Sequence, residues 1–332
     1  MKACITRKGA VLLGKYVACD GFNKAVPLRV VTHAHADHMG GLRQSLRECE
    51  KALMTEATKD LIDVLRSPLF LMEGCVETCG YGDPIEYEGE QITFFRADHI
   101  LGAAQVLVED AEGTRLVFTG DFRIESTPVL DADVLVMEAT YGAPSCQRSF
   151  RRNIENMLVS VVEGGLRKGT VYLFGYHGKL QETMQIMYQA GVKVPFVVPE
   201  RVLHVSKIYE KHGMHFGRRL ILHSEREAQE LLKKNSACLV FCHMSSRSRF
   251  GSEGFRVYIS GWQFNSPWRQ IGNNEYLVAL SDHSDFDGLI EYVRRSKPKL
   301  VITDNFRAGH AKTLAKEIRK RFNIPASALP RR

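Results

Sequence analysis

The sequence predicts an α/β fold in which a layered sandwich carries an inserted α/β unit. In the first half of the chain, apolar β-type segments repeatedly end at a titratable residue, as segment 28–31 does before His33. Beyond Tyr141 the pattern changes to alternating helices and strands, and near Tyr276 the chain returns to an apolar run that ends before His283. Open α/β folds build sites where strand ends converge, so this repetition indicates a layered architecture.

The individual elements follow in a regular order. Further β-type segments precede other candidate site residues: 92–95 before His99, 116–118 before Asp121 and 134–137 before Glu138. The inserted part is expected to contain helices at 154–163, 179–189 and 224–234, and strands at 171–174, 197–198 and 237–241. After His283 we expect a helix, a strand at 300–303 and a basic terminal helix. The expected boundaries give one domain from 1–147 and 263–332, interrupted by an inserted domain at 148–262.

Length and composition describe a globular protein that can bind a polyanion. The chain has 332 residues, enough for a full core and two domains. It has no 18-residue apolar stretch and no apolar block typical of a signal peptide, so we expect no membrane span and a cytoplasmic location. The formal net charge is +7, and several of the acids are expected at a metal site. A phosphate backbone is therefore a plausible partner.

Three histidines and a carboxylate lie within six residues, directly after a β-type segment: His33, His35, Asp37 and His38. Side chains two apart on an extended chain point the same way, so His33 and His35 can hold one metal while Asp37 and His38 face a second. Imidazole suits zinc, manganese or iron, and a carboxylate can hold a water for deprotonation. This motif predicts a hydrolytic dinuclear metal centre.

Other strand-end residues complete the expected centre. His99 supplies a third imidazole to the face formed by the first two histidines. Asp121 is expected to bridge two ions, because metals about 3.5 to 4 Å apart need a shared oxygen ligand. Asp98 is expected to orient His99, and Asp20 to support the site from behind the ligands.

On these residues and on further motifs, the chain resembles the metallo-β-lactamase-fold nucleases of the β-CASP group over essentially its full length. The further motifs are His99-Ile100-Leu101-Gly102, Gly120-Asp121, 137–142, 178–182, Ser260-Gly261-Trp262 and 280–285. Within the group the chain is most similar to the bacterial ligase-associated DNA exonucleases and the DNA cross-link repair (Artemis-like) branch. The resemblance implies a four-layer αββα metallo-β-lactamase sandwich with an inserted α/β β-CASP domain.

The resemblance also implies a role for each candidate residue. One metal is held by His33, His35 and His99, the other by Asp37 and His38, and both by Asp121. The implied catalytic residues are Asp37, Glu138 and His283. A carboxylate bonded to imidazole raises its basicity, which equips His283 to protonate a leaving oxygen. The implied cofactors are two divalent metal ions, with zinc expected and manganese or magnesium as alternatives at the second site.

One position departs from the group. Several branches carry a further metal-binding histidine 22 residues after the one that His283 matches, and here that position is Asn305. Asp304 or His310 is the candidate substitute for the missing ligand. Asparagine is a poor ligand for zinc, so we expect a second site that is weaker or prefers manganese or magnesium. The DNA cross-link repair branch also lacks this histidine, which favours DNA.

The expected function is metal-dependent hydrolysis of phosphodiester bonds in single-stranded nucleic acid, with DNA favoured, as an exonuclease in DNA repair or processing. Backbone phosphates are expected to bind Lys179, Ser245, Ser246, Arg247 and Arg249. A DNA ligase or other repair proteins are the partners that the resemblance implies. The alternatives are an RNA-processing β-CASP ribonuclease, a thioesterase- or lactonase-type hydrolase with His177 as its last metal ligand, and a non-catalytic nucleic-acid-binding subunit.

Overall fold

The computed structural model describes residues 2–66, 75–150, 153–251 and 254–331. The chain forms two compact units: Met1–Gln147 with Asp282–Arg332, and Arg148–Ser281. The second break therefore differs from the expected one at 262/263. The reason is that β17 (Trp268–Gly272) and β18 (Glu275–Val278) join β16 (Phe255–Ile259) in the sheet of the second unit.

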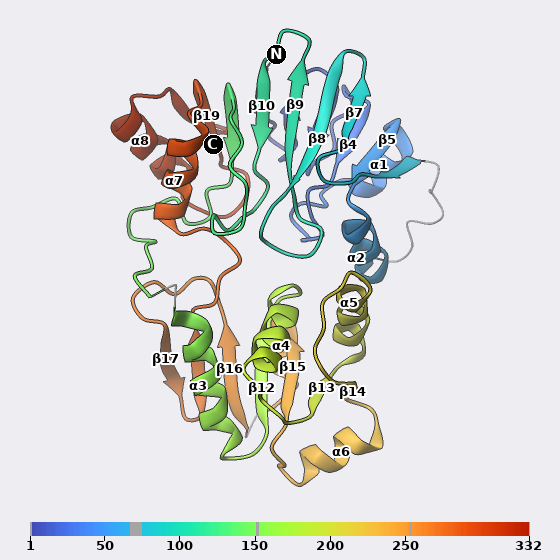
Figure 1. Ribbon diagram of the computed structural model, residues 1–332, viewed down its shortest axis with the longest axis vertical. Helices are drawn as coiled ribbons and strands as arrows, with labels where there is room; N and C mark the ends of the chain where they lie inside the picture. Colours follow the sequence, from blue (N-terminus) through green and yellow to red (C-terminus); the bar gives the residue numbers. More distant parts are fainter. Residues whose placement is uncertain (1, 67–74, 151–152, 252–253, 332) are drawn as a thin grey trace. The chain divides into compact units, whose positions relative to one another are not determined.

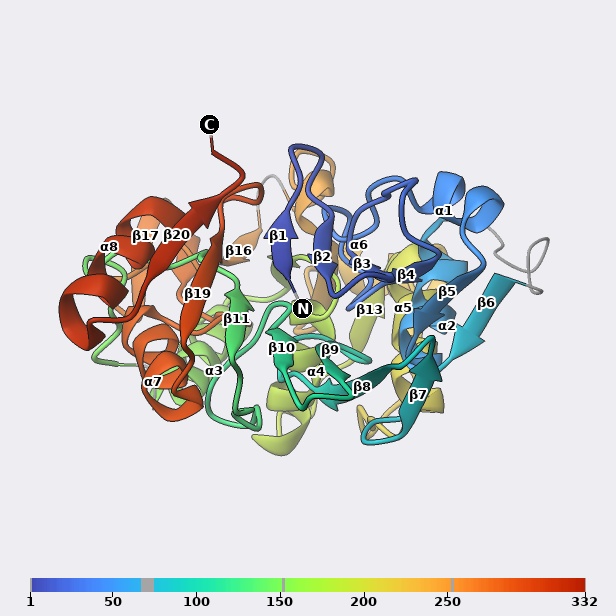
Figure 2. The ribbon, with the colours of Figure 1, turned by 90° about the horizontal axis from the view of Figure 1, so that it is seen from above.

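The first unit contains two sheets, which Figure 2 shows as separate layers. One sheet has its strands in sequence order: β1 (Ala3–Ile5), β2 (Val11–Leu13), β3 (Val17–Cys19), β4 (Leu28–Val30), β5 (Lys51–Met54) and β6 (Val76–Thr78). The other runs β20 (Ala326–Leu329), β19 (Leu300–Asp304), β11 (Val134–Met137), β10 (Arg115–Phe118), β9 (Ala104–Asp110), β8 (Glu90–Arg96) and β7 (Pro84–Tyr87). One buried apolar cluster takes side chains from both sheets, Val30 and Leu53 from the first and Phe94 and Val136 from the second.

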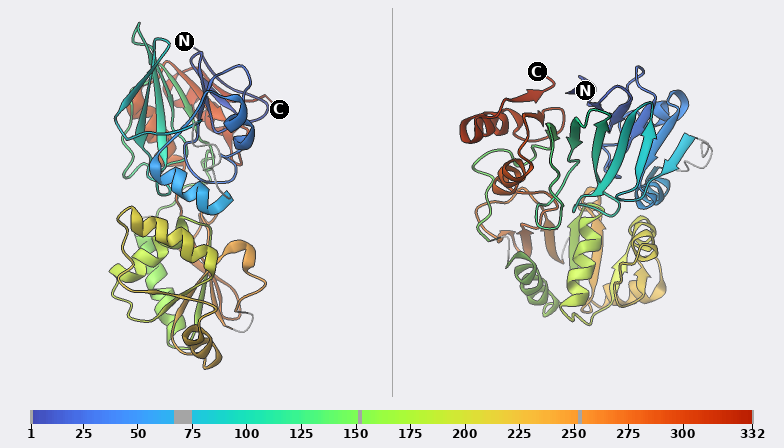
Figure 3. Two further views of the ribbon diagram at one scale, coloured as in Figure 1. Left: turned by 90° about the vertical axis from the view of Figure 1, so that its right-hand side faces the viewer. Right: turned by 45° about the horizontal axis from the view of Figure 1, so that its top comes forward.

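Helices lie against the outer faces of these sheets. On one side α1 (Leu42–Glu48) contacts β5, and α2 (Glu56–Arg66) follows that strand. On the other side α8 (Ala311–Phe322) contacts β19, β20 and α7 (Phe286–Ser296). Leu314, Ala315 and Ile318 of α8 are buried, and their spacing gives this helix one apolar face toward the sheet. The first unit is thus the expected four-layer αββα sandwich (Figure 3).

The C-terminal segment completes the second of these sheets. β19 pairs in parallel with β11, with Leu300 opposite Val134 and Thr303 opposite Met137. β11 is a continuous apolar run and β19 begins with one, Leu300-Val301-Ile302, as expected for parallel strands covered on two faces. A segment that follows the inserted part therefore returns beside a strand that precedes it.

The second unit has one seven-stranded sheet, flanked by helices (Figure 1). Its order is β14 (Leu220–Leu222), β13 (Phe196–Val198), β15 (Leu239–His243), β12 (Val171–Gly175), β16, β18 and β17. Only the β17–β18 pair among these neighbours is antiparallel. The helices are α3 (Ile154–Leu166), α4 (Lys179–Gln189), α5 (Glu200–Lys211) and α6 (Arg226–Lys233). None of the described helices combines the length and apolar character needed to cross a membrane.

Candidate metal centre

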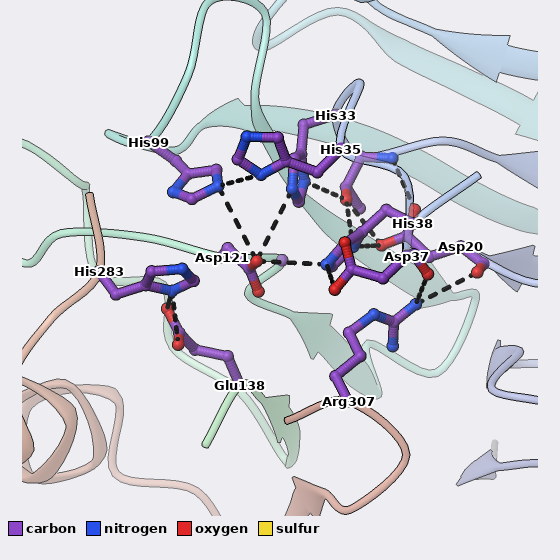
Figure 4. Close-up of polar contacts among 12 residues, drawn as sticks. Asp20, His33, His35, Asp37, His38, His99, Asp121, Glu138, His283 and Arg307 are labelled. Carbon is purple, nitrogen blue, oxygen red and sulfur yellow. Dashed lines mark hydrogen bonds and ion pairs between the residues drawn. The ribbon is translucent and has the colours of Figure 1, made fainter. Parts of the chain in front are cut away.

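The candidate site residues of the first unit follow strands whose carboxyl ends meet at one edge. β8 and β10 are both antiparallel to β9, and β10 is parallel to β11, so these three strands end on the same side. His99, Asp121 and Glu138 follow those ends, while the loop after β4 brings His33 from the facing sheet (Figure 4). The strand directions alone therefore gather residues that lie far apart in the sequence.

Four of the predicted ligands form one compact group, the metal cluster, composed of His33, His35, His99 and Asp121. One ligand atom from each lies within 4.8 Å of the others. Asp121 Oδ2 is 3.7 Å from His33 Nε2 and 3.9 Å from His99 Nε2, and His99 Nε2 is 3.0 Å from His35 Nδ1. His33 lies in a bend and His35 in irregular backbone rather than in the extended chain that we expected, yet the two side chains still face the same point.

The metal cluster fits one divalent ion. Burial lowers the pKa of all three imidazoles, that of His33 to well below its ordinary value and that of His99 to about 3. Neutral imidazole keeps a lone pair for a metal. His33 Nε2 is buried and has no hydrogen-bond partner among the described residues, a deficit that a metal bond would remove. Three nitrogens and one carboxylate oxygen are a donor set that zinc and other first-row ions accept.

His38 is fully buried beside the metal cluster, between two carboxylates. Its Nδ1 lies 2.7 Å from Asp20 Oδ2, and its Nε2 lies 3.2 Å from Asp121 Oδ2. Asp20 also accepts hydrogen bonds from Thr32 N and Oγ1 at 2.8 and 2.6 Å, so this carboxylate fixes the start of the histidine loop. Burial and Arg307 act to lower the pKa of His38, but the Asp121 and Asp20 carboxylates outweigh them and raise it to about 10.

Glu138, which is buried, and His283, which is partly exposed, form a pair on the other side of Asp121. The Nδ1 atom of His283 lies 3.1 and 3.0 Å from the two carboxylate oxygens of Glu138. Glu138 Oε1 also accepts from Phe122 N at 2.9 Å. Burial acts to lower the pKa of His283, but Glu138 and Asp121 raise it to about 9. The two carboxylates thus favour the protonated form of His283.

Asp98 does not have the role expected from its place next to His99. Its carboxylate binds Arg123, with Nη2 3.0 Å from Oδ1 and Nε 3.2 Å from Oδ2. His99 is oriented instead by the main-chain oxygen of Asp282, which lies 2.8 Å from Nδ1. The orienting group thus comes from the segment that follows the inserted part, which no local sequence pattern indicates.

The residues considered as substitutes for the missing histidine have other partners. The Asp304 carboxylate forms a buried ion pair with Arg307. Asn305 Nδ2 donates a hydrogen bond to Pro330 O at 2.9 Å. His310 is exposed and directly precedes α8. Asp304 and Asn305 are therefore already bonded to groups of the protein itself.

Arg307 is a site residue that we did not predict from the sequence. Its side chain is only 8% exposed, and its Nη2 donates to the main-chain oxygens of Asp20 at 3.1 Å and of Asp37 at 3.5 Å. Asp37 itself has a side chain that is 60% exposed, with Oδ2 3.7 Å from His38 Nε2. Nothing in the local sequence separates Arg307 from an ordinary surface arginine.

The predicted phosphate-binding residues all lie in the second unit, after two neighbouring parallel strands. Lys179 is buried at the start of α4, which follows β12. After β15, Ser245 Oγ lies 2.8 Å from His243 Nδ1 and Ser246 Oγ donates to His243 O at 2.7 Å. Arg247 and Arg249 follow and are exposed. Because β12 pairs in parallel with β15, the two groups lie at the same edge of that sheet.

Comparisons with known proteins add relatives of several kinds. An uncharacterised protein in the lig 3′ region of Acidianus ambivalens is 39% identical over 136 residues, which cover 40% of this chain and 97% of that protein. An RNase J-like protein of Methanocaldococcus jannaschii is 24% identical over 96% of this chain and 92% of its own length. A probable DNA ligase of Opitutus terrae is 26% identical over 88% of this chain, which spans only 28% of the ligase.

The structural comparison supports the fold. A crystal structure of a protein of unknown function from Enterococcus faecalis V583 covers 92% of this chain and aligns over 79% of its own, with a TM-score of 0.62 and 14% identity. No family model matches the sequence. The Acidianus protein is matched over nearly its whole length, and the RNase J-like protein matches nearly all of this chain. The chain belongs to the metallo-β-lactamase-fold nucleases of the β-CASP group.

Proposed function

We propose that this protein is a metal-dependent nuclease that hydrolyses phosphodiester bonds of single-stranded nucleic acid, with DNA as the favoured substrate. The observation that carries the proposal is the position of Asp121, whose carboxylate lies both in the metal cluster and beside the Glu138–His283 pair. A site for an electrophilic metal thus lies next to a group that can donate a proton. Both functions accelerate phosphodiester hydrolysis, the metal at the attacked phosphate and the proton donor at the leaving oxygen.

In this proposal the metal cluster holds a divalent ion, expected to be zinc, with manganese and magnesium as alternatives. When bound, the ion supplies Lewis acidity, which lowers the pKa of a water ligand and offsets negative charge on the phosphodiester. A hydrogen bond between His99 Nδ1 and Asp282 O orients the ring for metal binding. It directs Nε2 toward Asp121.

His283 acts as the general acid for the leaving sugar oxygen. Glu138 engages Nδ1 with both carboxylate oxygens, and Nε2, which lies 3.9 Å from Asp282 Oδ1, is the nitrogen that we assign to proton donation. With a pKa of about 9, His283 carries this proton at neutral pH. Its ring centroid lies 4.8 Å from that of His99, so the donor is adjacent to the metal cluster.

Substrate binding is assigned to the edge of the second sheet that carries Lys179, Ser245, Ser246, Arg247 and Arg249. Cationic and hydroxyl groups bind backbone phosphates without reading the bases, so this edge supports binding of a strand of any sequence. The positive net charge of +7 is consistent with such a partner.

DNA is favoured because one of the matched proteins is by name a probable DNA ligase. The proposed activity is that of an exonuclease in DNA repair or processing in the cytoplasm, with a DNA ligase as the candidate partner. The rival function is a ribonuclease, which the name of the RNase J-like relative favours.

The test is digestion of end-labelled single-stranded DNA and RNA of one sequence, each with Zn²⁺, Mn²⁺ or Mg²⁺. We expect the DNA to shorten progressively from one end, and labelling at either end reveals the direction. Asp121→Asn should abolish cleavage, whereas the exposed Asp131→Asn should leave it unchanged. Faster cleavage of RNA would replace the DNA assignment with the ribonuclease, and cleavage of neither would refute the nuclease.

A further inference from the structure

We propose that this protein holds one divalent metal ion per chain, and that the Arg307 guanidinium supplies the second positive charge that a second ion would otherwise provide. The inference rests on the proposed nuclease function and departs from the two ions that the family resemblance implies. It concerns the part of the site formed by His38 and Asp37, which lies beside the metal cluster and next to Arg307 (Figure 4).

The position of Arg307 is fixed by several bonds. Nη1 forms an ion pair with the Asp304 carboxylate, and this pair is buried on both sides, with 8% and 3% of the two side chains exposed. Nη2 donates to Asp20 O at 3.1 Å and Asp37 O at 3.5 Å. Asp20 is the residue whose carboxylate contacts His38 at 2.7 Å. The guanidinium is therefore held beside the residues that would bind a second ion.

The ligands available to a second ion are too few. His38 Nε2 and Asp121 Oδ2 are 3.2 Å apart and can serve, and the Asp37 carboxylate is near but 60% exposed. A further donor would have to come from the end of β19, where Asp304 is held by Arg307 and Asn305 by Pro330 O. Arg307 therefore has two effects: it occupies the Asp304 carboxylate and it contributes the positive charge.

The positive charge of Arg307 disfavours a second metal ion, as the shortage of ligands does. A guanidinium stays protonated at any pH at which the protein is folded, so its charge is permanent. In a buried site this charge is poorly screened, and it repels a divalent cation placed nearby. The positive charge that helps to bind a phosphodiester is thus present without a second metal.

Arg307 also retains a donor for a ligand. Its Nε is buried and has no hydrogen-bond partner among the residues that the structure describes, although the other two guanidinium nitrogens are bonded. A buried donor without a partner is costly unless a bound group accepts from it. A phosphate oxygen meets this requirement, because guanidinium pairs well with phosphate.

Metal content tests this assignment without reference to activity. Wild-type protein is equilibrated by dialysis against buffered Zn²⁺ or Mn²⁺, and bound metal is measured by mass spectrometry. We expect about one ion per chain in the wild type. In Arg307→Met, which removes the charge and the ion pair with Asp304 Oδ2, we expect a second ion to bind with an affinity at least about tenfold higher than in the wild type.

Two controls make the experiment specific. Arg307→Lys keeps the charge and should stay near one ion per chain. Arg256→Met removes a mostly buried arginine paired with Glu275 in the second unit, and should also leave the content at one. Circular dichroism checks that each variant is folded. Two tightly held ions in the wild type, or a folded Arg307→Met variant that still binds one, would overturn the proposal.

A variant that restores the histidine distinguishes the effect of the Arg307 charge from the effect of the missing ligand. Asn305→His alone should leave the metal content near one, because the guanidinium remains, whereas Asn305→His combined with Arg307→Met should bring it to two. If Asn305→His alone binds a second ion as tightly as the double variant, the guanidinium has no part in exclusion and the proposal fails. A protein with one ion that cleaves neither DNA nor RNA would refute the nuclease function and leave the metal count standing.

Discussion

At the scale of single residues, the Glu138–His283 pair illustrates how burial and charge act against each other. Desolvation favours neutral imidazole, yet two carboxylates beside the ring raise the pKa of His283 to about 9. With a pKa of about 9, the imidazole of His283 keeps its proton at neutral pH and loses it only as the pH rises past 9. Activity that depends on His283 as an acid should therefore decline in alkaline solution.

Glu138→Gln tests this dependence. The amide keeps a polar group near Nδ1 but removes the negative charge, so the pKa of His283 should fall toward its ordinary value of about 6.5. We expect kcat of the wild type to decline only near pH 9, and kcat of the variant to decline at least about one pH unit lower. The measurement is kcat from pH 6 to 10, with the exposed Glu112→Gln as control. An unchanged alkaline limb in Glu138→Gln would exclude His283 as the acid.

Single residues were predictable from the sequence only where the backbone decides their position. The metal cluster was predicted because its members follow strand ends that must meet at an edge. Asp98 was assigned wrongly because adjacency to His99 does not determine where its side chain points; it binds Arg123 instead. Arg307 was missed since its role depends on Asp304, Asp20 and Asp37 coming together in three dimensions.

At the scale of elements, the turn after β10 positions Asp121. Gly120 has φ 54°, in the left-handed region, and a Cβ at this position would lie 2.8 Å from Ala104 O. A main-chain oxygen of a paired strand cannot move away easily, since β9 is held by hydrogen bonds on both sides. The glycine therefore allows the close approach that places the Asp121 carboxylate among the histidines.

Gly120→Ala should reduce both stability and metal affinity. The positive φ costs about 1 kcal/mol for a residue with a Cβ, and the clash with Ala104 O adds to this cost and displaces Asp121. Gly113→Ala is a matched control, because Gly113 has φ 77° but no described atom lies within 4 Å of the point that its Cβ would occupy. Urea unfolding and metal content should show the backbone cost in both variants and metal loss in Gly120→Ala alone. Equal metal content would mean that this turn does not position Asp121.

The elements of the second unit were predicted in part. The helix expected at 179–189 matches α4, and the expected strands at 171–174 and 237–241 correspond to β12 and β15. The boundary at 262/263 failed because β17, with the sequence Trp-Arg-Gln-Ile-Gly, is largely exposed and has no apolar alternation. It is held by pairing with β18, a contact that local hydrophobic patterning does not reveal.

At the scale of the whole molecule, each unit is assigned one half of the proposed function. The first unit carries the metal cluster and the proton donor, and the second carries the proposed phosphate-binding residues. Contacts to phosphates and contacts to bases have different signatures in solution. Phosphate contacts release counterions from the nucleic acid, so the affinity that they provide falls steeply with salt and depends little on sequence.

Removing Arg247 and Arg249 should therefore weaken binding and reduce its salt dependence together. For single strands, the slope of log affinity against log salt changes by about 0.7 for each phosphate contact, so Arg247→Gln with Arg249→Gln should flatten it by about 1.4. Fluorescence anisotropy with labelled single-stranded DNA measures this slope, in an Asp121→Asn background that prevents cleavage. Arg226→Gln removes an exposed arginine bonded to Glu230 in the same unit, and its slope should match that of the parent. If the double variant also matches the parent, these arginines do not contact the backbone, and the phosphate-binding edge must be sought elsewhere on the chain.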